Sequence, residues 1–189
     1  MVKEECMNRA NFFASVRKDI FNGKLSQSQV MGLDALLEEY EKDPFDLRWM
    51  AYMLATAYHE TAATMQPIAE YGKGKGRKYG VPGKYGQVPY GRGFVQLTWD
   101  FNYEKADEEL NLDGALLKNF DLALDLHIAT RILFRGMFEG WFTAKKLSDY
   151  FNDKLTDWVN ARRIINGTDK AQHIAGIAQK FHAALKGAA

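Results

Sequence analysis

Cysteine and long apolar runs are nearly absent from this sequence. A single cysteine, Cys6, leaves no internal disulfide possible and fits folding in a reducing cytoplasm, and its polar N-terminal surroundings argue against a reactive nucleophile. No window approaches the ~18 apolar residues of a membrane span. Glu4, Glu5, Asn8 and Arg9 interrupt the apolar stretch that a secretory signal needs. We therefore expect a protein that is made in the cytoplasm and does not insert into a membrane.

An excess of charge of either sign is also missing. The 25 basic and 24 acidic side chains give a formal net charge of +1, so no global field draws the chain onto nucleic acid or membrane. The 189 residues, 47% of them apolar, fit one domain over residues 1–189 with a sizeable core. The four histidines lack zinc-type spacing, and one cysteine cannot complete such a site. We therefore expect no zinc site.

Apolar residues at helical spacing dominate most of the chain. Residues 8–22 predict a first helix, and Ser26 with Gln29 predicts a capping box that opens a second. Residues 47–64 predict a long, mostly apolar helix that is buried and that Pro67 stops. Further helices are expected from Trp99 onward, over 121–138, 144–151 and 156–163, and after Asn166-Gly167, where Thr168 or Asp169 would cap the last one.

The segment of residues 72–93 differs from the rest. It holds eight glycines, two of the four prolines, six basic residues and no acid. Such a segment is rich in turns, flexible and locally cationic. Short strands are expected at its edges, for example over 94–98. Together these patterns predict an α+β class, mainly α, with a large helical lobe and a small glycine-rich β lobe at about 66–98.

His59 and Glu60 stand near the end of the apolar helix. Glu60 follows Met53 and Thr56 at helical steps, so it lies on or beside a packed stripe. Partial burial and the negative end of the helix dipole both favour a protonated carboxyl, which a general acid requires. A single glutamate is more often a solvated helix residue, and a single histidine is more often a structural hydrogen-bonding group.

A second carboxyl, Glu70, follows ten residues later. A continuous helix would separate it from Glu60 by ~15 Å, but Pro67 favours a turn that can fold it back. Inverting glycosidases hold two carboxyl groups ~6.5–9.5 Å apart, with a water between them. The spacing permits such a pair. The alternative is a surface glutamate that balances Lys73 and Lys75.

Polar side chains follow the glycine-rich segment. Gln96 and Thr98 alternate with apolar residues, so on a strand they point the same way and can hold a water or a sugar amide. Tyr90, Trp99 and Tyr103 can stack on sugar faces, or can simply pack within a hairpin. Asn166 can bind a ligand, or can serve only the Asn-Gly turn.

Three runs resemble glycoside hydrolase family 19 in order and spacing: AYMLATAYHETAATMQPIAEYG, YGRGFVQLTWDFNY and RRIINGTD. That family includes plant and bacterial chitinases and a branch of phage endolysins. The resemblance extends from about residue 47 to the C-terminus. The N-terminal FFASVRKDIFNGKLSQSQVMGLDALL resembles the leading helices of the endolysin branch more than the plant enzymes.

The resemblance implies a lysozyme-like fold with a cleft between the two lobes. It implies that Glu60 is the general acid, that Glu70 is the general base, and that Thr98 helps to hold the attacking water. Some members carry an acidic residue in a charge network after the third run, and Asp169 lies near that place. Candidate substrate-binding residues are His59, Tyr90, Gln96, Asn102, Tyr103 and Asn166.

The implied reaction is hydrolysis, with inversion, of a β-1,4 bond to an N-acetylated sugar. The chitinases of the family have longer substrate loops than this chain has room for, which favours peptidoglycan over extended chitin. The basic segment 72–93 would meet the anionic cell wall. We therefore expect an endolysin-type lysozyme, a monomer without metal or cofactor. It would be made in the host bacterial cytoplasm and would act on the wall after release. The alternatives are a chitinase and a non-catalytic module that binds glycan or nucleic acid.

Overall fold

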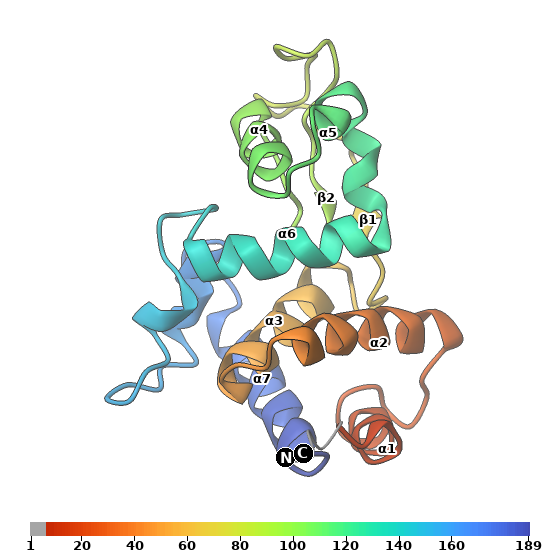
Figure 1. The fold of residues 1–189 in the computed structure, drawn as a ribbon, viewed down its shortest axis with the longest axis vertical. Helices are drawn as coiled ribbons and strands as arrows, with labels where there is room; N and C mark the ends of the chain where they lie inside the picture. Colours follow the sequence, from red (N-terminus) through yellow and green to blue (C-terminus); the bar gives the residue numbers. More distant parts are fainter. Residues whose placement is uncertain (1–6) are drawn as a thin grey trace.

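The computed structural model describes residues 7–189, so the expectation for Cys6 lies outside it. It contains α-helices, short 3-10 helices (η) and a two-stranded sheet (Figure 1), which confirms the predicted α+β, mainly α class. The elements in chain order are α1 (Arg9–Asp19), α2 (Gln27–Lys42), α3 (Leu47–Glu60), β1 (Ile68–Ala69), β2 (Arg92–Gly93), α4 (Asp100–Glu109), α5 (Ala115–Lys118), η1 (Phe120–Leu124), α6 (Leu126–Glu139), η2 (Leu147–Asp149), η3 (Asn160–Ile164) and α7 (Ala171–Lys186).

Side-chain caps determine where the first three helices begin. Asn8 caps α1, and Ser26 and Gln29 form the predicted capping box at α2. The Asp46 carboxylate accepts the backbone N–H of Arg48 at 2.8 Å and so begins α3. Each cap satisfies a backbone donor that has no partner within its own helix.

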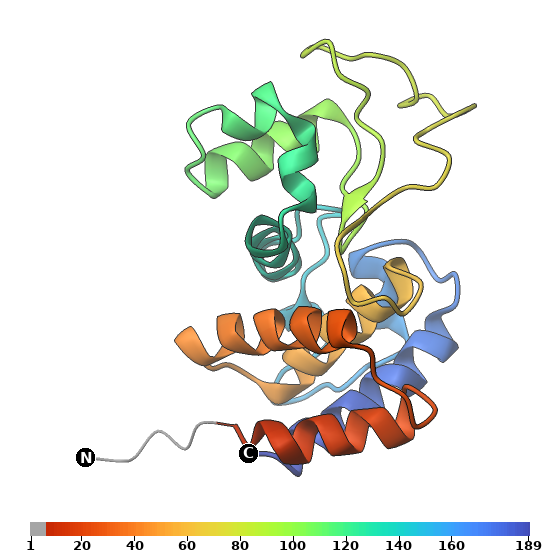
Figure 2. The same ribbon diagram turned by 90° about the vertical axis from the view of Figure 1, so that its right-hand side faces the viewer.

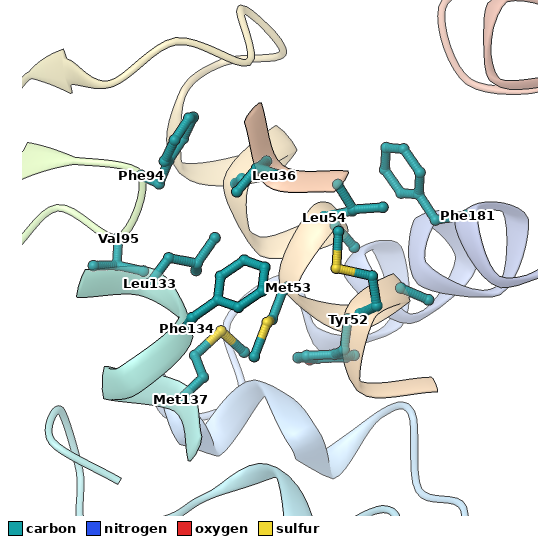
Figure 3. Close-up of a cluster of buried hydrophobic side chains, with 14 of the residues drawn as sticks. Leu36, Tyr52, Met53, Leu54, Phe94, Val95, Leu133, Phe134, Met137 and Phe181 are labelled. Carbon is teal, nitrogen blue, oxygen red and sulfur yellow. The ribbon is translucent and has the colours of Figure 1, made fainter. Parts of the chain in front are cut away.

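Helix α3 is the central helix of the molecule. Residues Met50–Ala57 are all buried, as the apolar run predicts. The helix packs chiefly against α7 and also contacts α2 and α6. Figure 3 shows Met53 of α3 meeting Phe134 and Met137 of α6, with Phe181 of α7 farther along. Removing this apolar surface from water stabilises the fold and makes α3 a fixed support for the residues at its end.

Helix α6 separates two groups of elements. In Figures 1 and 2, α1, α2, α3 and α7 lie on one side of it, and α4, α5 and the sheet lie on the other. Strands β1 and β2 pair antiparallel, with Ile68 opposite Gly93 and Ala69 opposite Arg92. The long loop between them extends away from the helices at the top right of Figure 2. The predicted β lobe is therefore a very short ribbon with a large loop.

The first and last described helices lie side by side. The backbone N–H of Asn8 donates to the carbonyl of Ala188 at 2.7 Å, and α1 packs on α7. Within residues 7–189, no helix is both long enough and apolar enough to cross a bilayer.

The strand predicted over 94–98 is wrong. Gln96 adopts a φ of 54°, in the left-handed region, and this turns the chain. A single bridge from Leu97 back to Arg92 is all that remains of the pairing. The segment is consequently a tight turn, and periodicity alone cannot place its side chains.

Three predicted helices have different boundaries. The helix expected over 121–138 is split into η1 and α6, because Asp125 accepts the N–H groups of His127 and Ile128 and starts a new helix. The helices expected over 144–151 and 156–163 are reduced to η2 and η3.

The last predicted helix is present but begins later. Helix α7 starts at Ala171, and Lys170, in a left-handed conformation, is its N-cap residue. Neither Thr168 nor Asp169 caps it. The carbonyl of Asp169 instead accepts Arg162 Nε at 3.1 Å.

Candidate active site

A cleft of about 460 Å³ joins the two candidate carboxyl groups. Glu60 and Glu70 line it together with Gln96, Thr98 and Asn166. These residues come from the end of α3, the end of β1, the turn after β2 and the loop after η3. Segments that are far apart in the sequence therefore meet at one site, between the helical lobe and the β lobe.

Glu60 is held by a buried cation. Arg162 Nη1 donates to Glu60 Oε1 at 2.6 Å, and the two side chains are 3% and 16% exposed. This contact fixes one carboxyl oxygen of Glu60 against the helical lobe. Arg162 was not singled out from the sequence, although it lies in the RRIINGTD run.

The turn after Glu60 replaces the last part of the predicted helix 47–64. The Thr61 hydroxyl donates to the Ala57 carbonyl at 2.7 Å and accepts the Met65 N–H at 3.2 Å. Ala62, Ala63 and Met65 adopt positive φ angles. The helix thus ends seven residues before Pro67, with Glu60 as its last residue.

Helix α2 holds this turn in place. Gln29 Nε2 donates to the Ala63 carbonyl at 2.9 Å. At Gly32 the helix touches the turn so closely that an added Cβ would lie 1.6 Å from the Met65 carbonyl oxygen. The turn between Glu60 and Glu70 is therefore held in place by its contacts with α2.

Glu70 follows directly after β1. Its backbone N–H donates to the Gly91 carbonyl at 2.7 Å, which continues the pairing of the two strands. The Gly91 N–H in turn donates to Glu70 Oε2 at 3.2 Å, and the Tyr79 hydroxyl donates to Oε1 at 3.2 Å. Both carboxylate oxygens of Glu70 are therefore held from the β lobe.

Thr98 and Gln96 both line the cleft, although residues 94–98 do not form the predicted strand. Gln96 Nε2 donates to the carbonyls of Ile68 at 3.1 Å and Gly93 at 3.3 Å, so its amide braces the two strands. The Thr98 carbonyl accepts Asn102 Nδ2 at 2.9 Å. Among residues 7–189 no group hydrogen-bonds the Thr98 hydroxyl, which leaves it available to a water.

A second hollow of about 210 Å³ extends the cleft. It shares Gln96 and Thr98 with the first and is also lined by Trp99, Phe101 and Asn102. The Trp99 and Phe101 rings stack at 6.3 Å with an interplanar angle of 17°. Asn102 therefore lies in this hollow beside two exposed aromatic rings.

The structure contradicts the expected contact between Tyr103 and substrate. Its side chain is fully buried, its ring stacks on Phe120 at 4.0 Å, and its hydroxyl donates to the Tyr90 carbonyl at 2.9 Å. Tyr90 lines neither hollow. Its ring covers the buried guanidinium of Arg92 at 3.5 Å, and Arg92 also pairs with Asp121 at 2.7 Å. Tyr90 and Tyr103 therefore make structural contacts within the β lobe.

His59 and Asn166 differ in their position relative to the cleft. Asn166 is exposed and lines the cleft. His59 lies outside both hollows, with its ring 6.4 Å from that of His173 on α7. Burial lowers the pKa of the His59 imidazole, and the nearby Glu60 carboxylate only partly offsets this effect. The structure thus gives no substrate-facing position to His59.

Solved structures of bacterial chitinases share this arrangement of elements. A bacterial family 19 chitinase is 23% identical, with a TM-score of 0.61 over 95% of both chains. Chitinase C from Streptomyces griseus is 20% identical, with a TM-score of 0.63 over 97% of this chain and 78% of its own. A Glu-to-Gln mutant of chitinase C is 21% identical, with a TM-score of 0.54 over 98% and 95%.

The chain has the fold of the family 19 chitinases. No family model matches the sequence, and no curated protein matches it. The bacterial chitinase is matched over nearly its whole length, so a short chain does not by itself separate this protein from the chitinases. The expectation that shorter loops disfavour chitin therefore loses its basis.

Proposed function

We propose that this chain is a glycoside hydrolase that cleaves β-1,4 bonds of bacterial peptidoglycan with inversion at the anomeric carbon. The observation that carries the proposal is the convergence of Glu60, Glu70 and Thr98 on one cleft. The shared fold supports it, because the solved neighbours are chitinases. An inverting mechanism needs two carboxyl groups and a water between them, and Glu60 and Glu70 line one cleft of about 460 Å³.

In this proposal the two carboxyl groups have opposite tasks. The Glu60 carboxyl gives its proton to the glycosidic oxygen as the bond to the anomeric carbon breaks. A water attacks that carbon from the opposite face, and the Glu70 carboxylate takes the proton that the water loses. The Thr98 hydroxyl orients this water. Exchange of protons with solvent then restores the protonated Glu60 and the ionised Glu70.

Arg162 has a part in the same cycle. Once Glu60 has given up its proton, the resulting carboxylate lies 2.6 Å from Arg162 Nη1. A fixed guanidinium at a developing negative charge stabilises the transition state of proton donation.

The charge of the loop favours peptidoglycan over chitin. Lys73, Lys75, Arg77 and Lys78 are all exposed on the loop that carries Tyr79 to the cleft. Chitin is neutral, whereas the stem peptides of peptidoglycan carry carboxylates. Exposed cations at the edge of a cleft attract an anionic polymer and do little for a neutral one.

The second candidate is a chitinase, and the identity of the structural neighbours favours it. A non-catalytic glycan-binding module is the third. The two carboxyl groups in one cleft argue against it, because a binding module needs neither an acid nor a base.

Product analysis tests the proposal. Purified peptidoglycan and chitin hexamers are digested in parallel, the products are identified by mass spectrometry, and the anomer first released is read by NMR. We expect soluble muropeptides released as the inverted anomer. Cleavage of chitin alone would establish the chitinase, and binding without cleavage would establish the module.

The proposal extends to where the protein acts. As an endolysin it would be made in the host cytoplasm and would reach the wall after release. Expression in a bacterial host should therefore cause lysis only after the membrane is opened, for example with chloroform. Lysis without such treatment would contradict this part of the proposal.

A further inference from the structure

In the β lobe, Tyr79 contacts both Glu70 and Trp99. Its hydroxyl donates to Glu70 Oε1 at 3.2 Å, and its ring meets the Trp99 ring edge-on at 5.4 Å. Tyr79 also lines the cleft itself. Burial and the neighbouring Glu70 carboxylate raise the pKa of the Tyr79 phenol, so it keeps its proton and remains a donor at neutral pH.

The loop that carries Tyr79 closes on itself. Backbone hydrogen bonds close its successive turns. In the first, the Lys73 N–H donates to the Glu70 carbonyl; in the last, the Gly80 N–H donates to the Arg77 carbonyl at 3.0 Å. Gly74 and Gly80 touch across the loop. A Cβ added to Gly80 would lie 1.8 Å from the Gly74 carbonyl oxygen. Only glycine permits this approach, and it places Tyr79 one residue before the crossing.

We propose that the closed loop 72–80 holds Tyr79 as the positioning residue for Glu70. The Tyr79 hydroxyl fixes one carboxylate oxygen and the Gly91 N–H fixes the other, so the lone pairs that remain are directed into the cleft. This inference rests on the proposed function, in which Glu70 is the base. In this proposal the close contact between Gly74 and Gly80, the glycine crossing, maintains the distance between the loop and β1.

Replacing Tyr79 by Phe removes the hydroxyl and keeps the ring against Trp99. Hydrogen bonds to charged groups contribute enough that we expect kcat to fall about ten- to a hundredfold. KM should change little, because the wall of the cleft keeps its shape. Tyr71→Phe is the control, because Tyr71 is 86% exposed and directly precedes the closed loop.

A double-mutant cycle separates positioning from a general structural role. In a Glu70→Gln protein, Tyr79→Phe should cause no further loss of the residual activity, because Tyr79 acts through the carboxylate. Losses that multiply in the double variant would overturn the inference. So would an unchanged kcat in Tyr79→Phe.

A matched pair of glycine variants tests the crossing. Gly80→Ala should lower kcat as Tyr79→Phe does, because the new methyl group forces the loop open. Gly72→Ala has no atom within 4 Å of its Cβ and should leave kcat unchanged. Equal effects of the two variants would refute the role of the crossing. If the unsubstituted protein cleaves no glycan, the proposed function fails first; if it cleaves and the Tyr79 variants behave normally, only this inference fails.

Discussion

Arg162 donates to Glu60 across 102 residues of sequence, and this contact joins η3 to the end of α3. It holds the acid of the proposed mechanism from the helical lobe. Glu70 is held separately, by Tyr79 and Gly91 of the β lobe. The two carboxyl groups therefore belong to different lobes, and the packing between the lobes sets their separation.

Glu60→Gln tests the acid. The variant keeps the shape of the side chain and removes its titratable proton, so we expect activity to fall about 10²–10⁴-fold. The Tm should also fall slightly, because the buried guanidinium of Arg162 loses its anionic partner. Activity is measured on purified peptidoglycan and Tm by calorimetry. Glu38→Gln on the exposed face of α2 is the control, and near-normal activity in Glu60→Gln would refute the assignment.

Thr98→Val tests the water. The variant is nearly isosteric but cannot hydrogen-bond a water, so we expect kcat to drop by about tenfold or more with little change in KM. Thr98→Ser keeps the hydroxyl and should retain most of the activity. If KM rises instead and kcat is unchanged, Thr98 is a sugar contact and does not orient the water.

The helices were predictable because their signals are local. Apolar spacing predicted the buried α3, and Ser26 with Gln29 predicted the cap of α2. The end of α3 was not predictable, because the Thr61 hydroxyl and the contact with Gly32 of α2 decide it. A contact with a distant helix leaves no periodic pattern near Glu60.

The site was predictable only in part, for the same reason. Resemblance placed Glu60, Glu70 and Thr98, and all three line one cleft. Periodicity failed at Gln96, whose positive φ turns the chain. Tyr79 carried no signal, because turns in a glycine-rich segment follow from backbone contacts rather than from side-chain spacing.

Burial of histidine predicts a loss of stability in mild acid. Burial lowers the pKa of His182, and Lys186 acts in the same direction. The unfolded chain therefore binds more protons than the folded chain below pH about 6.5, so stability is complete above that pH and falls as the pH drops toward the folded value. Hydrogen bonds from Asn160 lower the pKa of Asp157, but that carboxyl responds only below pH about 4.

Thermal unfolding at pH 7.5 and 5.5 measures this effect. The drop in Tm between the two values should be smaller in His182→Gln than in the unsubstituted protein. His127→Gln, at an exposed position on α6, is the control. An equal drop in all three proteins would show that His182 does not contribute.

The cations of the loop predict a salt-dependent activity. Outside residues 72–93 the chain has 19 basic and 24 acidic side chains, so the loop is a local positive patch on an otherwise acidic molecule. Exposed charges are screened over ~8 Å at physiological ionic strength. Replacing Lys73, Lys75 and Lys78 by Gln should therefore lower activity on intact peptidoglycan at low salt and flatten its dependence on salt. Lys84 is left in place because it pairs with Glu104 at 2.8 Å.

A second triple variant separates local from net charge. Lys18, Lys24 and Lys154 are exposed on other parts of the surface, and replacing them by Gln changes the net charge by the same amount. This control should keep the salt dependence of the unsubstituted protein. Cleavage of short neutral oligosaccharides should be similar in all three proteins, because Glu60 and Glu70 remain. Equal losses in the two triple variants would attribute the effect to net charge, and losses on both substrates in the loop variant would mean that these lysines shape the cleft.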